Sequence, residues 1–208
     1  MANFLIGLLG ALPDCVTSLI YLQAWRSPDL LGPVTVKNLM LVMLLEIFVV
    51  LAAGVYGGSA ARSDQSTARR LLTFVAVTLV LLLFVAGFAL AFGDSWWPVY
   101  AFLWLFGSRC LLLWLHPGQP RDNAFRSTML CLGSLGAFIV GAIITTYLPW
   151  PELGVTPEFV ASMQLSGEGV WIKSPQTVLA FGVLYFALIA ALKFKLGRSR
   201  RAAPTTAG

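Results

Sequence analysis

The sequence predicts an all-α fold: a polytopic membrane protein whose six transmembrane helices form one bundle, with the N- and C-termini cytoplasmic. Hydrophobic residues make up 58% of the 208 residues and charged residues 11%, well below the quarter or so that is typical of soluble domains. Apolar runs of about twenty residues recur, which is the length that a helix needs to cross a bilayer, whereas barrel strands need about ten alternating residues. Lys and Arg gather in alternate connections, as expected for cytoplasmic loops.

The first two predicted helices, residues 3–25 and 35–56, each carry an acid near the middle. Asp14 follows Pro13, and a proline opens the helix locally, so that neighbouring helices can satisfy a buried polar group there. Glu46 lies at the centre of its apolar run, where a carboxylate is costly. The start of the chain imitates a secretory signal, but it lacks a basic region and is interrupted by Asp14. We therefore expect it to be retained as the first span.

The third and fourth helices are predicted at residues 71–92 and 97–115. Residues 71–92 contain no charge and are apolar on every side, which is typical of a peripheral helix that faces lipid. The fourth helix contains Arg109, three residues beyond its midpoint at Phe106. At a rise of about 1.5 Å per residue, the long side chain of Arg109 reaches the middle of the bilayer.

The fifth helix, residues 127–147, carries a stripe of small residues, Gly133, Ala137 and Gly141, at intervals of four. Such a stripe lets another helix backbone approach closely. We expect it to pack inside the bundle; the alternative is contact with a membrane-protein partner or with a second copy of the chain. Prolines in the preceding connection are expected to end one helix and delay the next.

The sixth helix is predicted at residues 176–194, after an outer loop at residues 148–175. Within that loop, Thr156-Pro157-Glu158 has the form of a helix start, which predicts a short helix on the membrane surface. Residues 1–195 form a single transmembrane domain, and residues 196–208 are expected to be a disordered basic tail.

Orientation follows from the distribution of Lys and Arg. Ten lie in the connections and tail assigned to the inside and three in those assigned to the outside, which favours cytoplasmic termini. The inside set comprises Arg62, Arg69, Arg70, Arg121, Arg126, Lys193, Lys195, Arg198, Arg200 and Arg201, and the outside set comprises Arg26, Lys37 and Lys173.

Asp14, Glu46 and Arg109 are the ionisable residues deep in the apolar runs, and they form the candidate substrate or ion pathway. Two carboxylates in one low-dielectric site cannot both ionise cheaply, so one would stay protonated, which suits a proton or cation step. The alternative is that Arg109 pairs with one acid and the second is neutral, only to fix helix packing. Lys37 is expected to extend its charge to the outer interface; its alternative role is as a partner for Asp14 or for a polar substrate group.

The sequence contains no recognisable catalytic, metal-binding or cofactor-binding set. His116 is the single histidine, and Cys15, Cys110 and Cys131 all lie in apolar runs, where an odd number of thiols cannot build a disulfide framework. The basic residues lie at helix ends, so the net charge reports orientation and does not indicate nucleic-acid binding.

Three functions remain open. The sequence favours a non-catalytic protein or accessory subunit, in contact with the lipid bilayer and placed in a bacterial inner (plasma) membrane. The first alternative is a small proton- or cation-linked carrier or channel that uses the midplane acids. The second alternative is an intramembrane enzyme that acts on lipid, with Asp14 or Glu46 as acid or base.

Overall fold

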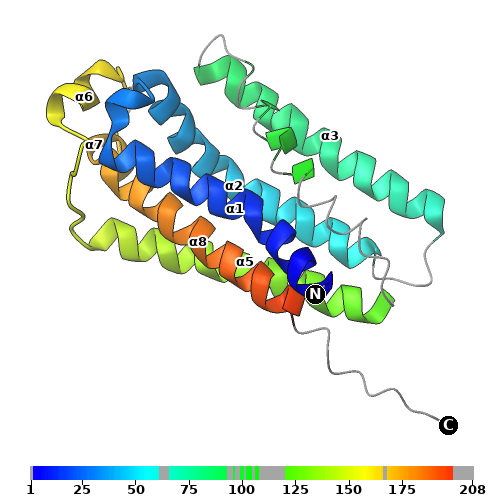
Figure 1. Cartoon of the computed structure of the whole chain (residues 1–208). Coiled ribbons are helices and arrows are strands. Elements are labelled where there is room, and N and C mark those ends of the chain that lie inside the picture. Colours follow the sequence, from blue (N-terminus) through cyan, green and yellow to red (C-terminus); the bar gives the residue numbers. More distant parts are fainter. Residues whose placement is uncertain are drawn as a thin grey trace.

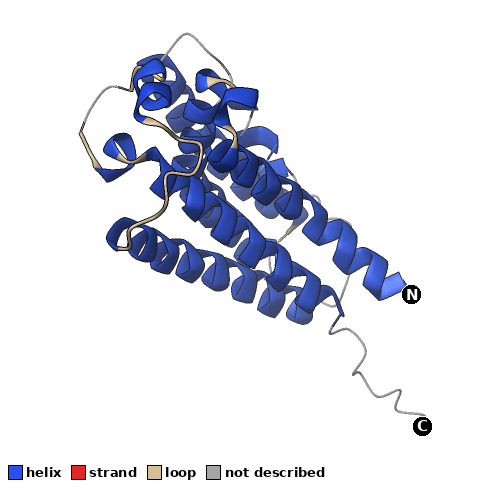
Figure 2. Cartoon of the chain, turned by 60° about the vertical axis from the view of Figure 1, so that its left-hand side comes forward, coloured by secondary structure: helices blue, strands red, loops and turns tan. Residues whose placement is uncertain are grey.

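The computed structural model describes residues 2–60, 66–92, 96, 99–100, 102–104, 106–107, 120–165 and 168–198. In these residues the chain forms helices joined by loops, without a strand (Figures 1 and 2). Four helices are long and apolar enough to cross a membrane: α1 (Ala2–Arg26), α2 (Pro33–Ala60), α5 (Pro120–Tyr147) and α8 (Pro175–Arg198). The described part of the chain is therefore all-helical, with four candidate membrane spans.

The helix α8 packs against α1, α2 and α5 (Figure 1). The helix α2 in turn packs against α5 on one side and α3 (Thr67–Phe92) on the other. Apolar side chains of α3 such as Leu72, Leu79 and Leu83 are exposed, which fits the predicted peripheral position. The start of α1 and the end of α8 lie at the same end of the bundle (Figure 1).

Among the described helices, α1 and α8 share the most extensive contact. Gly182 lies directly against the ring of Tyr21, and a Cβ at position 182 would overlap that ring. One turn along α1, the Ser18 hydroxyl donates a hydrogen bond to the carbonyl oxygen of Val183 at 2.9 Å. The Tyr21 hydroxyl donates across to the Leu39 carbonyl oxygen of α2 at 2.5 Å. A missing side chain on α8 thus allows two helices to meet over a buried aromatic ring.

The small-residue stripe of α5 faces α8. A Cβ on Gly141 would lie 2.6 Å from Cε2 of Phe181, and one on Gly133 would lie 3.0 Å from Cδ2 of Leu192. Ala137, between them, packs against the main hydrophobic core, which α1, α2 and α8 build from residues such as Tyr21, Met43 and Phe181. The predicted packing of the stripe inside the bundle is confirmed, whereas contact with a partner at this stripe stays a prediction.

Several helices begin earlier than predicted because a proline occupies their first position. The helix α2 begins at Pro33 instead of residue 35, and α5 begins at Pro120 instead of residue 127. The first helical residue has no intrahelical use for its backbone N–H, and the fixed φ of proline suits it. The prolines before α5 were assigned to delay that helix, but Pro120 starts it.

Other boundaries also differ from the prediction, and α2 ends at Ala60 instead of residue 56. The helix α3 begins at Thr67, four residues early, where the Ser66 hydroxyl accepts a hydrogen bond from the Arg69 backbone N–H at 3.3 Å. The helix α8 ends at Arg198 and so includes the first three residues assigned to the tail. The rest of that tail lies outside the described residues.

The predicted helix at residues 97–115 falls mostly outside the described residues. Its described positions include Phe102 and Phe106, which are buried and stack with ring centroids 5.5 Å apart. They belong to a second core with Leu45 and Val49 of α2 and Val85 of α3.

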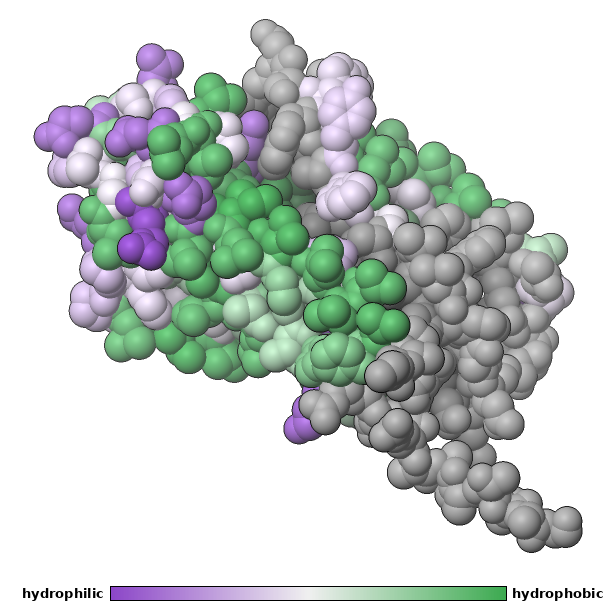
Figure 3. Space-filling view, viewed as in Figure 1, coloured by the Kyte–Doolittle hydropathy of each residue, from purple (hydrophilic) through white to green (hydrophobic). Residues whose placement is uncertain are grey.

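The predicted short helix of the outer loop is confirmed as α6 (Pro157–Ser162). The Thr156 hydroxyl caps it by accepting a hydrogen bond from the Phe159 backbone N–H at 3.3 Å. The backbone N–H of Glu158 and the Thr156 hydroxyl hold the pKa of the Glu158 carboxyl below its usual range. Two other short elements were not predicted, η1 (Pro28–Leu30) and α7 (Val170–Lys173). Hydrophilic residues gather at this end of the bundle, and hydrophobic residues cover its middle (Figure 3).

The outer loop is fastened to the end of α1 through Gly154. Its backbone N–H donates to the Trp25 carbonyl oxygen at 3.1 Å, and the Trp25 indole N–H donates to the Pro151 carbonyl oxygen at 2.9 Å. A Cβ at position 154 would collide with the Arg26 carbonyl oxygen. Because backbone cannot move aside as a side chain does, we expect Gly154→Ala to release the loop and cost about 1–3 kcal/mol.

Limited proteolysis checks this prediction. Cleavage between residues 148 and 156 should accelerate at least several-fold in Gly154→Ala. Gly136→Ala is the control, because a Cβ there meets open space. Equal cleavage of the two variants would contradict the prediction.

Candidate functional site

Asp14 forms an ion pair with Lys193 of α8. The Lys193 Nζ donates to Oδ2 of Asp14 at 2.5 Å, and the two side chains are 10% and 7% exposed. The carbonyl oxygen of the preceding residue, Pro13, accepts a hydrogen bond from the Thr17 hydroxyl at 2.8 Å. The pair is therefore a nearly buried charge pair inside the bundle, where the loss of one partner is far more costly than at a surface.

Glu46 is completely buried and contacts the same helix. It is 0% exposed, and its Oε1 accepts a hydrogen bond from the Tyr185 hydroxyl at 2.9 Å. The ring of Tyr185 is held by Phe138, Phe181 and Phe186, with centroid distances of 5.8, 5.9 and 5.2 Å. This aromatic packing fixes the direction of the phenol hydroxyl toward the carboxyl group.

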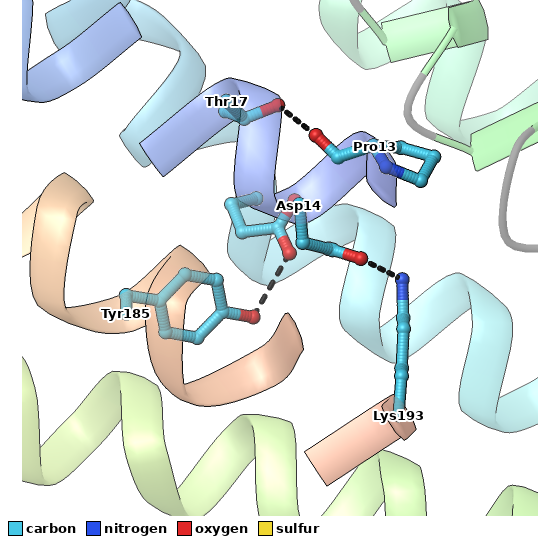
Figure 4. A network of polar contacts seen from close by, with 6 residues as sticks. Pro13, Asp14, Thr17, Tyr185 and Lys193 are labelled. Atoms are coloured by element: carbon cyan, nitrogen blue, oxygen red, sulfur yellow. Dashed lines mark hydrogen bonds and ion pairs between the residues drawn. The ribbon is translucent and has the colours of Figure 1, made fainter. Parts of the chain in front are cut away.

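The two acids lie at similar distances from the connection between α1 and α2, and both have a partner on α8. Asp14 is twelve residues from the end of α1 at Arg26, and Glu46 is thirteen residues from the start of α2 at Pro33. Along their helices, both acids are thus about 18–20 Å from the connection at residues 27–32, inside two of the candidate membrane spans. Figure 4 shows Asp14 with Lys193, and Tyr185 pointing into the same region. The helix α8 supplies a partner to each of the two acids.

The other predicted site residues are placed differently. Arg109 lies outside the described residues, so its predicted approach to the two acids stays a prediction. Lys37 is half-buried in the first turns of α2 and makes no ion pair with the described residues. The alternative role of Lys37 as a partner for Asp14 is not seen among the described residues, where Lys193 pairs with Asp14. Its expected role at the membrane interface stays a prediction.

Sequence reasoning missed Lys193 and Tyr185 as site residues. Lys193 was counted only as a marker of the cytoplasmic side, although it lies inside α8, eight residues from Tyr185 and four from the fully buried Ile189. That spacing places all three on one helix face. A buried tyrosine hydroxyl in an apolar helix also needs a hydrogen-bond partner. That requirement could have identified Tyr185 as a candidate site residue.

Among the described residues, no group of three or more His, Cys, Asp or Glu side chains is arranged to hold a metal ion. The arrangement can instead pair opposite charges inside the bundle and hold a carboxyl group next to a phenol hydroxyl group. No protein-family model, no curated protein and no solved structure matches the chain. Function therefore has to be inferred from the contacts described above.

Proposed function

We propose that the chain is a non-catalytic membrane protein that works as an accessory subunit. The observation that carries the proposal is that α8 engages both deep acids, Asp14 through Lys193 and Glu46 through Tyr185. Both contacts join different helices, and removing one partner of a buried ion pair is strongly destabilising. The burial of both carboxyl groups also argues against a lipid-acting enzyme, which would need an acid open to the headgroups.

We further propose six spans with cytoplasmic termini in a bacterial inner membrane. The helix α3 and residues 97–115 would supply the two spans beyond the four candidates. The excess of Lys and Arg in the connections assigned to the inside supports this orientation. Single cysteines at Ser162 and Ser199, in a chain freed of its own cysteines, should react with impermeant reagents from opposite sides. Reaction from the same side would overturn the topology.

The outer face of α5 is the surface proposed for a partner. In the apolar span of α5 only 17% of the residues are buried, compared with 56% in α8, and Leu132, Ile139 and Ile143 are exposed. A photo-crosslinking residue at Ile143 should give one discrete adduct in native membranes. The matched control is Leu83 on α3, which is also exposed.

The crosslinking result tells whether α5 contacts a second copy of the chain, another protein or no partner. An adduct from Ile143 but not from Leu83 would support a subunit interface, and its mass would tell a second copy from another protein. No adduct from Ile143, together with a native mass of one chain in lipid nanodiscs, would overturn the accessory role.

A second candidate function is a proton- or cation-linked carrier. The observation that favours it is the complete burial of the Glu46 carboxyl group near the middle of a span, because such residues often mark ion pathways. Purified protein in liposomes should then show pH-dependent flux that is abolished by Glu46→Gln. Equal flux in wild type and variant would remove this candidate.

A further inference from the structure

The short helix α6 lies at one end of the bundle (Figure 1) and takes part in its core. Although the helix has only six residues, the side chains of Phe159 and of the capping residue Met163 are 7% and 4% exposed and belong to the main hydrophobic core. The helix α6 contacts α2, whose residues Val36, Leu39 and Met40 belong to the same core. The departure of α6 would therefore uncover the first turns of the buried face of α2.

This face of α2 leads to a buried polar contact. One turn after Val36, the carbonyl oxygen of Leu39 accepts the hydrogen bond from the Tyr21 hydroxyl at 2.5 Å. All three residues are buried. Because three residues of a helix rise by about 4.5 Å, water that reached Val36 would lie about one turn from this contact between α1 and α2.

The segment that carries α6 is bounded by two residues with left-handed backbone. Leu153 and Gln164 have φ values of 50° and 49°, and they are the non-glycine residues with positive φ in the part of the chain that the structure describes. Gln164 directly follows the capping residue of α6, a position at which glycine is usual. Both side chains are exposed, so their own packing does not compensate for the cost of this conformation. Strain of this kind gathers in segments that switch between two positions.

The backbone of residues 155–164 is not tied to the spanning helices. Its described hydrogen bonds, such as that from the Gln164 N–H to the Ala161 carbonyl oxygen at 3.2 Å, end within residues 152–164. Gly154, just before this segment, is the residue that donates to the Trp25 carbonyl oxygen of α1. The position of α6 thus depends on its apolar side chains, and α6 can leave the bundle with its backbone hydrogen bonds intact.

We propose that residues 155–164 form a lid, which lifts from the end of the bundle as one unit and turns about two hinges, Leu153 and Gln164. In the closed position, burial of the apolar side chains of the lid outweighs the strain at the hinges. In the open position the hinges relax, and water reaches the face of α2 that begins at Val36. The lid controls when this end of the interior is wet, and it rests neither on the accessory role nor on the carrier.

Cysteine labelling of the full chain in lipid nanodiscs tests the lid. In a chain freed of its own cysteines, Met163→Cys places a thiol on the buried side of the lid, and Ser162→Cys places one on its exposed side. A charged, water-soluble maleimide should label Met163→Cys more slowly than Ser162→Cys, because the first thiol is reachable only while the lid is open. It should still label Met163→Cys at least about tenfold faster than Leu179→Cys, which is buried in α8 and uncovered only when the bundle itself opens.

A second buried position tests whether the segment moves as one unit. Val155 is 2% exposed and lies at the other end of the lid. Because one movement uncovers both ends, Val155→Cys and Met163→Cys should be labelled at rates within about threefold of each other. Labelling of Met163→Cys without labelling of Val155→Cys would mean that the end of α6 frays, and it would overturn the proposal.

The hinges are tested by removing their strain. Leu153→Gly combined with Gln164→Gly should slow the labelling of Met163→Cys by at least about threefold, because glycine removes the strain of the closed lid and this effect outweighs the freedom that glycine adds to the open one. The matched control is Glu152→Gly, which adds glycine beside a hinge at a residue without positive φ. It should not slow the labelling.

Three further results would overturn the lid. They are labelling of Met163→Cys as slow as that of Leu179→Cys, labelling as fast as that of Ser162→Cys, and labelling that the two hinge substitutions do not slow. The first would mean that the segment leaves only on unfolding, the second that it is never closed, and the third that the strained residues are not hinges. None of them bears on crosslinking from α5, so failure of the lid and failure of the accessory role are separable.

Discussion

Replacing Lys193 with methionine should destabilise the bundle by about 3–5 kcal/mol, because removing one partner leaves the buried carboxylate of Asp14 without its cation. Methionine keeps much of the length and apolar packing of the lysine stem, so the loss reports the charge pair more than the volume. The measurement is reversible unfolding in mixed micelles as the denaturing detergent fraction rises, followed by helical circular dichroism. The variant should unfold at a clearly lower fraction than wild type.

Two controls make this result specific. Asp14→Asn combined with Lys193→Met removes both charges and should recover at least half of the loss, because no uncompensated charge stays buried. Lys195→Met alters an exposed lysine two residues further along α8 and should stay within about 0.5 kcal/mol of wild type. A loss below about 1 kcal/mol for Lys193→Met, or no recovery in the double variant, would contradict a structural ion pair.

The sequence predicted the features of this bundle that depend on local pattern. Apolar runs of bilayer length gave the helices, and the cost of a carboxylate at that depth singled out Asp14 and Glu46. The spacing of Gly133, Ala137 and Gly141 gave a packing face, which meets Phe181 and Leu192. The capping residue and proline before Phe159 gave α6. Each of these rests on residues that are close together in the chain.

The partners of the two acids could not be predicted from local sequence pattern. Lys193 lies 179 residues from Asp14, and Tyr185 lies 139 residues from Glu46, so the pairing depends on which helix packs against which. The prediction that prolines between the apolar runs end or delay helices was also too general. Pro33, Pro120 and Pro175 each begin a helix, as Pro157 was predicted to do, because the first helical N–H needs no partner.

Gly182→Val should destabilise the bundle by about 3 kcal/mol, through overpacking where α1 and α8 meet. The added side chain would overlap the ring of Tyr21. That ring cannot move aside easily, since it is 0% exposed, stacks on Phe186 with centroids 5.5 Å apart, and is tied to the Leu39 carbonyl oxygen by its hydroxyl. The same unfolding measurement in mixed micelles should show the loss.

The matched control is Gly136→Val, which places the same side chain in open space on α5. It should leave stability nearly unchanged, because valine is at least as favourable as glycine in a helix. Shortening the obstructing ring with Tyr21→Leu should cost stability in wild type but much less in Gly182→Val, since the two residues share one contact. If the losses in the double variant simply add, or if Gly136→Val costs as much as Gly182→Val, then α1 and α8 do not meet over Tyr21. The alignment of α1 along α8, on which the pairing of Asp14 with Lys193 depends, would then be wrong.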